Sequence, residues 1–177
     1  MPVHPPGLTA ATGGGGGSAD CFLHVQTKRA GKIKGEASSP GHVDDIVVSG
    51  WSWGLQAGSA LGDTQATARR SYSALTVHKH VDSATTALMS ALANNDEVKE
   101  AKLSLRRAGG EQEDFFVITL KAARITSVQH SGADDGGTRE TLTIAFTEVE
   151  VEYRTQKSSG IRGGTFSFTD SLPSSRA

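Results

Sequence analysis

The chain has little cysteine and little proline, and it lacks any long apolar run. Its one cysteine, Cys21, cannot form an internal disulfide, so we expect the protein to fold in a reducing compartment. No stretch reaches the roughly 18 apolar residues of a membrane-spanning helix, so we expect no membrane insertion. Residues 1–19 contain no lysine, no arginine and no apolar core, so the sequence predicts no signal peptide.

The chain also lacks an excess of charge of either sign. Its 177 residues include 18 lysines and arginines against 19 aspartates and glutamates. Proteins that bind nucleic acid need a marked basic excess, so nucleic acid is not expected as a partner. A chain of this length forms one domain with a real core, and its near-neutral charge permits many copies to associate closely.

Proline and glycine divide the chain into three parts. Residues 41–172 contain no proline, which suits long paired strands because proline cannot donate to a strand ladder. Residues 1–19 hold three of the five prolines and the glycine run 13–17, a composition that predicts a flexible arm. Residues 157–177 are polar and contain glycine, so we expect a mobile or partner-ordered tail. The folded domain is predicted to span residues 20–156.

Alternation of apolar and polar residues predicts most of the domain to be strand. The expected strands span residues 20–26, 46–53, 71–78, 97–107, 116–122 and 142–153. The inward residues lose their register near Ala123 and Arg124, and their parity changes at Thr147–Glu148, so we predict a bend or bulge at each place. Long strands that bend midway allow a small barrel to curve and close.

One segment has helical instead of strand periodicity. Five residues recur at helical spacing: Val81, Thr85, Leu88, Met89 and Leu92. We predict a helix at about residues 83–93 with this stripe in the core, begun by the capping carboxylate of Asp82. Residues 54–70 are rich in glycine and small residues and are predicted to be a loop. The sequence therefore predicts a mainly β fold, an antiparallel β-barrel of two sheets with one flanking α-helix.

The most distinctive catalytic motif is the sequence Gly-Trp-Ser-Trp-Gly at residues 50–54, which fits the G-x-S-x-G of serine hydrolases. That motif needs a helix after the serine, and the residues that follow have no helical periodicity. A serine hydrolase using Ser52 is therefore a less favoured alternative. His78 and His80 share one face of a strand, but a metal site needs three or four ligands. We predict no catalytic residue, no metal and no cofactor, and we expect the protein not to be an enzyme.

Six segments are distinctive as an ordered set: Lys34-Gly35-Glu36, Trp51-Ser52-Trp53-Gly54, His78-Lys79-His80-Val81-Asp82-Ser83-Ala84-Thr85, Arg106-Arg107-Ala108-Gly109-Gly110, Phe116 to Leu120 with Ile125 to Val128, and Leu142 to Tyr153. In this order they resemble the haemolysin-coregulated protein (Hcp) family, the tube subunits of the bacterial type VI secretion system. The resemblance covers about Asp20 to Gln156. The family usually has serine in place of Ala37 and lysine in place of Ser83, and its first strand usually begins nearer the first residue.

The resemblance implies that copies close into hexameric rings and that the rings stack into a hollow tube. The implied partners are further copies of the chain, the sheath and spike proteins of the secretion machine, and effector proteins carried in the lumen. It also implies assembly in the bacterial cytoplasm, then secretion to the extracellular space or a target cell without a signal peptide. Residues 55–72 correspond to an extended loop that reaches a neighbouring ring. The candidate stacking residues are Leu55, Gln56, Arg69, Arg70 and Tyr72.

Two further alternatives come from other classes of protein. A phage-type tail tube protein is structurally close to this family and is the main alternative. A monomeric ligand-binding barrel is the other, and it would be distinguished by a monomeric mass in solution.

Overall fold

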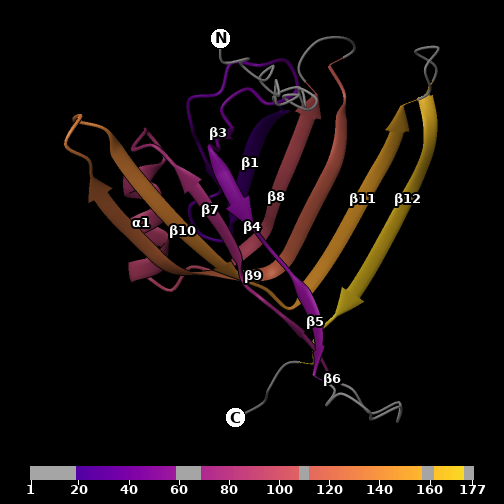
Figure 1. Cartoon of the computed structure of the whole chain (residues 1–177). Coiled ribbons are helices and arrows are strands. Elements are labelled where there is room, and N and C mark those ends of the chain that lie inside the picture. Colours follow the sequence, from indigo (N-terminus) through magenta and orange to yellow (C-terminus); the bar gives the residue numbers. More distant parts are fainter. Residues whose placement is uncertain (1–18, 59–68, 108–111, 157–161, 174–177) are drawn as a thin grey trace, which may run out of the picture.

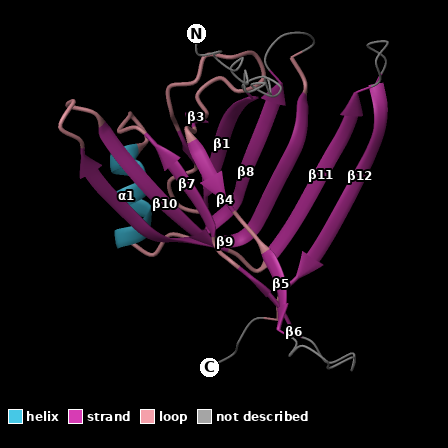
Figure 2. Ribbon diagram, viewed as in Figure 1, coloured by secondary structure: helices cyan, strands magenta, loops and turns pink. Residues whose placement is uncertain are grey.

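The computed structural model describes residues 19–58, 69–107, 112–156 and 162–173, and it is mainly antiparallel β structure with one helix (Figures 1 and 2). The strands before the helix are β1 (Ala19–Thr27), β2 (Lys32–Ile33), β3 (Ile46–Val47), β4 (Gly50–Ser52), β5 (Leu55–Gly58), β6 (Arg69–Tyr72) and β7 (Leu75–Lys79). After helix α1 (Thr85–Ala93) come β8 (Val98–Arg107), β9 (Asp114–Gly132), β10 (Thr138–Ala145), β11 (Glu148–Gln156) and β12 (Arg162–Ser171). In the described residues no helix has the length and apolarity to span a membrane.

Strand β9 bends midway and belongs to two sheets. It pairs with β11 as far as Lys121 and with β8 as far as Ala123, and from Arg124 onward it pairs with β10. Ala122, at the bend, has a φ of 45°, in the left-handed region that residues with a side chain rarely adopt. The bend predicted at Ala123–Arg124 is thus confirmed at the preceding residue, and it lets one strand turn the corner between the two sheets.

The first sheet runs in the order β12-β11-β9-β8-β1, with β2 and β3 on the far edge of β1, and the second runs β9-β10-β7-β4. In Figure 1 the two sheets diverge from β9, with α1 beside β10 and with β11 and β12 on the opposite side. The predicted fold class, two antiparallel sheets with one helix, is confirmed. The barrel is open, because within the described residues β12 pairs only with β11 and β4 only with β7.

Two further corners lie where the chain crosses between the sheets. Strand β10 ends at Ala145 and β11 begins at Glu148, so the parity change predicted at Thr147–Glu148 is confirmed. The prediction of one strand over residues 46–53 is wrong. Strand β3 pairs with β1 and β4 pairs with β7, because the chain passes from the first sheet to the second between them.

The core lies between the sheets and under α1. Its fully buried members are mostly inward residues of the long strands: Leu23, Val25, Leu75, Val77, Leu103, Ile118, Leu120, Leu142 and Ile144. The helix packs against β9 and buries Thr85, Leu88 and Ala91. The predicted apolar stripe is wrong for Met89 and Val81, which are each 47% exposed. Val81 precedes the first turn, and the buried positions at every third residue form a narrower stripe than the sequence suggested.

The last strand is a correction to the predicted tail. Residues 162–171 form β12, which pairs along β11 from Glu148–Ser171 to Gln156–Arg162. The prediction of a mobile tail is therefore wrong for this strand, because hydrogen bonding to β11 orders it. Most of its side chains remain exposed, so a role for a partner on this strand stays a prediction.

Candidate assembly surfaces

The residues predicted to stack rings lie on a two-stranded hairpin formed by β5 and β6, hereafter the hairpin. Leu55 faces Tyr72, Gln56 faces Ser71, and the pairing ends at Gly58 and Arg69. The predicted loop at residues 54–70 therefore contains strand at both ends, and residues 59–68 lie outside the described part of the chain. In Figure 1 the hairpin projects from the bottom of the two sheets, away from α1.

A carboxylate on β12 holds the hairpin. The Arg70 guanidinium donates from Nη2 to Asp170 Oδ1 at 2.9 Å and from Nε to the other carboxylate oxygen. The Tyr72 hydroxyl donates to Asp170 Oδ2 at 2.6 Å, and Arg70 Nη2 also donates to the Ser171 carbonyl at 3.1 Å. Hydrogen bonds from Arg70 and Tyr72 lower the pKa of Asp170 to about 2, so this carboxylate stays charged at neutral pH.

Aromatic rings seat the base of the hairpin. The Tyr72 ring lies 5.8 Å from Trp53 and 5.6 Å from Phe146, the latter edge to face. Because aromatic pairs at such distances are attractive, Tyr72 is fixed at both its ring and its hydroxyl. Of the predicted stacking residues, Arg70 and Tyr72 are thus bonded within the subunit, whereas Leu55 and Gln56 are exposed.

The inward face of the first sheet continues beyond the core and becomes exposed. Opposite residues in antiparallel strands share a face, so the register defines rows across β8, β9, β11 and β12. One row reads Leu103, Ile118, Val151 and Phe168, and the next reads Leu105, Phe116, Tyr153 and Phe166. Along the first row the exposed fraction rises from 0% at Leu103 to 43% at Phe168. Tyr153, Phe166 and Phe168 together form what we call the aromatic face, with Phe166 exposed by 63%.

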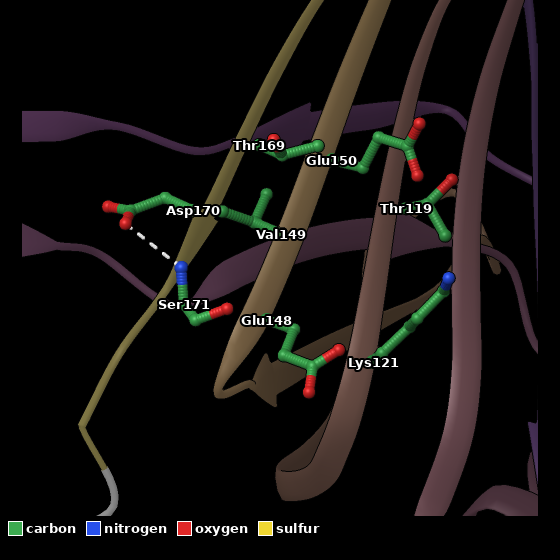
Figure 3. Close-up of a pocket in the computed structure, with 8 residues that line it drawn as sticks. All are labelled: Thr119, Lys121, Glu148, Val149, Glu150, Thr169, Asp170 and Ser171. Carbon is green, nitrogen blue, oxygen red and sulfur yellow. Dashed lines mark hydrogen bonds between the residues drawn. The ribbon is translucent and has the colours of Figure 1, made fainter.

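The opposite face of the same strands is polar, and we call it the polar face. Its rows consist, apart from Val117, of charged and hydroxyl side chains. The first row is Glu100, Lys121, Glu148 and Ser171, the second is Lys102, Thr119, Glu150 and Thr169, and the third is Ser104, Val117, Glu152 and Ser167. A shallow hollow of about 340 Å³ lies among Thr119, Lys121, Glu148 and Glu150 (Figure 3). Because charges of both signs alternate there, this face is suited to contact with water.

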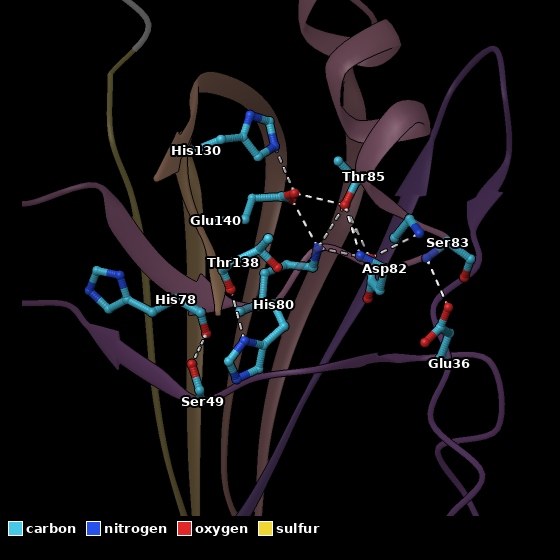
Figure 4. Close-up of polar contacts among 12 residues, drawn as sticks. Glu36, Ser49, His78, His80, Asp82, Ser83, Thr85, His130, Thr138 and Glu140 are labelled. Atoms are coloured by element: carbon cyan, nitrogen blue, oxygen red, sulfur yellow. Dashed lines mark hydrogen bonds and ion pairs between the residues drawn. The ribbon is translucent and has the colours of Figure 1, made fainter. Parts of the chain in front are cut away.

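The segment resembling the family's strand-to-helix junction encloses a buried ion cluster (Figure 4). Lys79 Nζ lies 2.9 Å from Glu140 Oε1 and 2.8 Å from Asp82 Oδ1. Thr85 donates from Oγ1 to Glu140 Oε2 at 2.7 Å, and His130 Nε2 lies 2.9 Å from the same oxygen. The prediction that Asp82 caps the first turn of α1 is wrong: Ala84 holds the cap position and no side chain caps the helix, and Asp82 Oδ1 accepts the backbone N–H of Ala84 at 3.0 Å instead.

Sequence reasoning missed this cluster, although a signal for it was present. Lys79 follows Leu75 and Val77 at the inward parity of β7, and Glu140 precedes Leu142 at the inward parity of β10.

The Lys34-Gly35-Glu36 segment of the family resemblance contacts the residues just before α1. Ser83 donates its backbone N–H to Glu36 and its hydroxyl to the Lys34 carbonyl, at 3.1 Å and 3.2 Å.

A second polar cluster fastens residues 34–45 to the first sheet. His42 is buried, with Nδ1 2.9 Å from Asp45 Oδ2 and Nε2 2.9 Å from Asp114 Oδ1. Its ring stacks on Phe22 at 4.4 Å, and Arg106 lies over the same Phe22 ring. Because both ring nitrogens face carboxylates, both can donate only when the imidazole is protonated.

The residues weighed for catalysis and metal binding do not assemble into a site. Ser52 is exposed on β4, and strand β5 follows it where a nucleophile elbow requires a helix. His78 Nδ1 lies 3.2 Å from the Thr141 hydroxyl. His80 Nδ1 lies 2.9 Å from the Thr138 carbonyl (Figure 4). Across the described ranges, no three histidine, cysteine, aspartate or glutamate side chains lie together in a metal-binding arrangement.

Comparison with known proteins gives one consistent result. Residues 22–153 match the family model described as "Type VI secretion system effector, Hcp". The protein Hcp1 of Pseudomonas aeruginosa is 36% identical over 152 residues, which cover 83% of this chain and 90% of that protein.

Solved structures agree with these sequence matches. A structure described as a type six secretion system protein superposes with a TM-score of 0.79 at 25% identity, covering 90% of this chain and 99% of that one. Hcp1 from Salmonella typhimurium superposes with a TM-score of 0.70 at 24% identity, over 87% and 95% of the two chains.

The fold and these matches define the class of the protein, a β-rich tube protein of a secretion machine. More particularly, the chain belongs to the Hcp family of type VI secretion tube proteins. The resemblance seen in the sequence is therefore confirmed, and the phage-type, hydrolase and ligand-binding alternatives are not favoured.

Proposed function

We propose that copies of this chain close edge to edge into a hexameric ring that serves as a structural part and not as a catalyst. The observation that carries the proposal is the aromatic face, which is exposed next to the edge of β12 that has no strand partner in the described residues. Exposed aromatic rings and unpaired strand groups both gain from coverage by another chain. A head-to-tail contact between one end of the sheet and the other end of a second copy closes into a ring.

The polar face lines the lumen of this ring. Because a neighbouring copy covers the aromatic face of the same sheet, the opposite face of that sheet is directed toward the hollow centre of the ring. Alternating Glu and Lys side chains and the hydroxyls of β12 keep such a wall hydrated. Effector proteins carried in the lumen contact this wall, and sheath and spike proteins complete the machine. Assembly takes place in the bacterial cytoplasm, and release to the extracellular space or a target cell follows.

The hairpin makes the contacts between stacked rings. It projects from the base of the sheets, and Leu55 is 46% exposed there. Leu55 lies opposite Tyr72 at the base of this projection, and the next ring can cover an exposed apolar side chain there without disturbing the contacts around the ring.

The double charge reversal Arg69→Glu and Arg70→Glu tests the stacking role. We expect rings of unchanged mass in solution and a loss of secreted protein from cells that carry only this variant. Secretion at the wild-type level would show that the hairpin does not join rings. A matched charge reversal on the polar face, Lys102→Glu, should leave stacking intact.

A further inference from the structure

Asp170 connects two surfaces with different proposed roles. It lies on β12 two residues after Phe168 and on the same side of the strand, so it belongs to the row next to the aromatic face. That row reads Ala101, Leu120, Val149 and Asp170. The hairpin covers the end of this row through Arg70 and Tyr72, whereas the two rows that end in Phe168 and Phe166 stay open.

The hairpin has few other means of fixing its direction. A two-stranded hairpin alone is at best marginally stable in water, so its orientation depends on contacts with the rest of the fold. In the described residues these contacts are the Asp170 bonds, the Arg70 bond to the Ser171 carbonyl, the packing of Tyr72 on Trp53 and Phe146, and the Ser73 bond to the Gly54 carbonyl at 3.0 Å. The bonds to Asp170 and to the neighbouring Ser171 carbonyl join the hairpin to β12, and of these two residues only Asp170 contributes a side chain.

Strand β12 is itself held on one side only. It pairs with β11 and, in the described residues, has no strand on its other edge. An edge strand opens more readily than a strand paired on both sides, so Asp170 is least firmly placed in a lone subunit. A neighbouring copy that covers Phe166 and Phe168 would hold β12, and with it Asp170.

We propose that Asp170 is a positioning residue that couples ring closure to ring stacking: the contact that orders β12 also orients the hairpin toward the next ring. This inference rests on the proposed function. It predicts an order of assembly, because a lone subunit presents a poorly oriented hairpin and therefore stacks less readily than a closed ring.

The inference differs from the simplest role for Arg70, which is direct contact with the next ring. In the structure the Arg70 guanidinium is committed to Asp170 by two bonds and to the Ser171 carbonyl by a third. If Arg70 acts through Asp170, exchanging the two charges should restore part of the function. If Arg70 itself touches the next ring, the exchange should restore nothing.

The test compares Asp170→Asn, Arg70→Asp and the double exchange Arg70→Asp with Asp170→Arg in the full-length protein. Glu152→Gln is the matched control, since it removes a carboxylate paired with Arg154 at 3.2 Å on the adjacent strand. Three quantities are measured: the mass of the ring, hydrogen–deuterium exchange of the amides in Leu55–Gly58, and the amount of chain secreted by cells that carry only the variant.

We expect Asp170→Asn and Arg70→Asp to keep the ring mass, to speed hairpin exchange by about tenfold, and to reduce secretion by at least a similar factor. The double variant Arg70→Asp with Asp170→Arg should recover part of the amide protection of the hairpin and part of the secretion. The control should match wild type in both. The inference would be overturned if Asp170→Asn left the hydrogen–deuterium exchange of the hairpin unchanged. It would also be overturned if the double variant Arg70→Asp with Asp170→Arg were as defective as Arg70→Asp alone.

Two outcomes are separated in advance. If Asp170→Asn fails to fold, Tyr72→Phe removes a single donor and should give an intermediate increase in hairpin exchange, whereas no increase counts against the clamp. If wild type forms no ring, the proposed function fails. Hydrogen–deuterium exchange of the hairpin amides, compared between wild type and Asp170→Asn as lone subunits, still decides whether Asp170 orients the hairpin.

Discussion

The ammonium nitrogen of Lys79 lies 2.9 Å from a carboxylate oxygen of Glu140, and neither side chain is exposed to solvent. The two residues are far apart in sequence, on neighbouring strands β7 and β10. Asp82 and Thr85, at the start of α1, bind the same pair. The ion pair thus fastens the beginning of the helix to the second sheet.

Removing either partner of this pair should destabilise the fold strongly. Lys79→Met leaves Glu140 buried without its cation, and the free energy of unfolding should fall by about 3–5 kcal/mol. Glu140→Leu should have a similar cost, whereas the double replacement should cost less than the sum because neither Lys79 nor Glu140 is then left as a lone buried charge. Urea unfolding of the three variants measures this. Single variants within about 0.5 kcal/mol of wild type would show that the pair is not buried in solution.

Stability should decrease in acid because carboxylates are stabilised as anions in the fold. Burial alone would raise the pKa of Glu140, but hydrogen bonds from Thr85 and Lys79 outweigh it and lower that pKa. Burial is likewise outweighed at Asp45, where His24, His42 and Lys32 lower the pKa. A carboxyl group whose pKa is lowered in the folded state stabilises the fold at pH values above its ordinary pKa of about 4. This stabilisation is lost as the pH falls through the folded-state pKa.

We therefore expect the free energy of unfolding to drop as pH falls below about 5, and to drop less steeply in Asp45→Asn. The measurement is urea unfolding at a series of acidic pH values. A parallel fall in wild type and in Asp45→Asn would contradict the assignment of this pH dependence to Asp45.

Gly35, in the Lys-Gly-Glu segment, is required by a close backbone approach. A Cβ there would lie 2.7 Å from Ile46 Cα and would also contact the Asp45 carbonyl oxygen. Neither backbone group can move aside like a flexible side chain, so Gly35→Ala should cost about 1–3 kcal/mol. Gly132→Ala is the control, since a Cβ at that position has no atom within 4 Å. Equal stability of the two variants in urea would exclude the steric explanation.

The aromatic face should be needed for the ring but not for the fold. Phe166→Ser with Phe168→Ser removes two rings that are 63% and 43% exposed, so the far-ultraviolet circular dichroism and unfolding midpoint should change little. The mass in solution should shift from ring toward single subunit, as measured by sedimentation velocity. Ser167→Ala, on the other face of β12, should keep the ring. A double variant that still forms rings would place the ring contact elsewhere.

Features that depend on local periodicity could be predicted from the sequence. The bends near Ala122 and Thr147 follow from parity changes within single segments, because a one-residue shift moves every side chain to the other face. The long strands and the helix were visible for the same reason, whereas the family resemblance rested on the ordered set of segments that includes Trp51-Ser52-Trp53-Gly54. Met89 was misplaced because five residues at helical spacing, four of them apolar, do not reveal how narrow the buried side of the helix is.

Features that depend on contacts between distant segments could not be predicted. Nothing near Arg70 in sequence points to Asp170, and the partner became visible only when β12 was paired with β11. Strand β12 itself carried a signal, since Phe166 and Phe168 alternate with Ser167 and Thr169, but its glycines and polar residues indicated a tail. The burial of Lys79 was not predicted, because a buried lysine requires partners that only the fold brings together.

The mass of the wild-type chain in solution tests the central claim most directly. Native mass spectrometry or light scattering at micromolar concentration should give about 111 kDa, six times the 18.5 kDa chain, as expected for a closed ring. A single species of 18.5 kDa that persists as the concentration is raised would contradict the account.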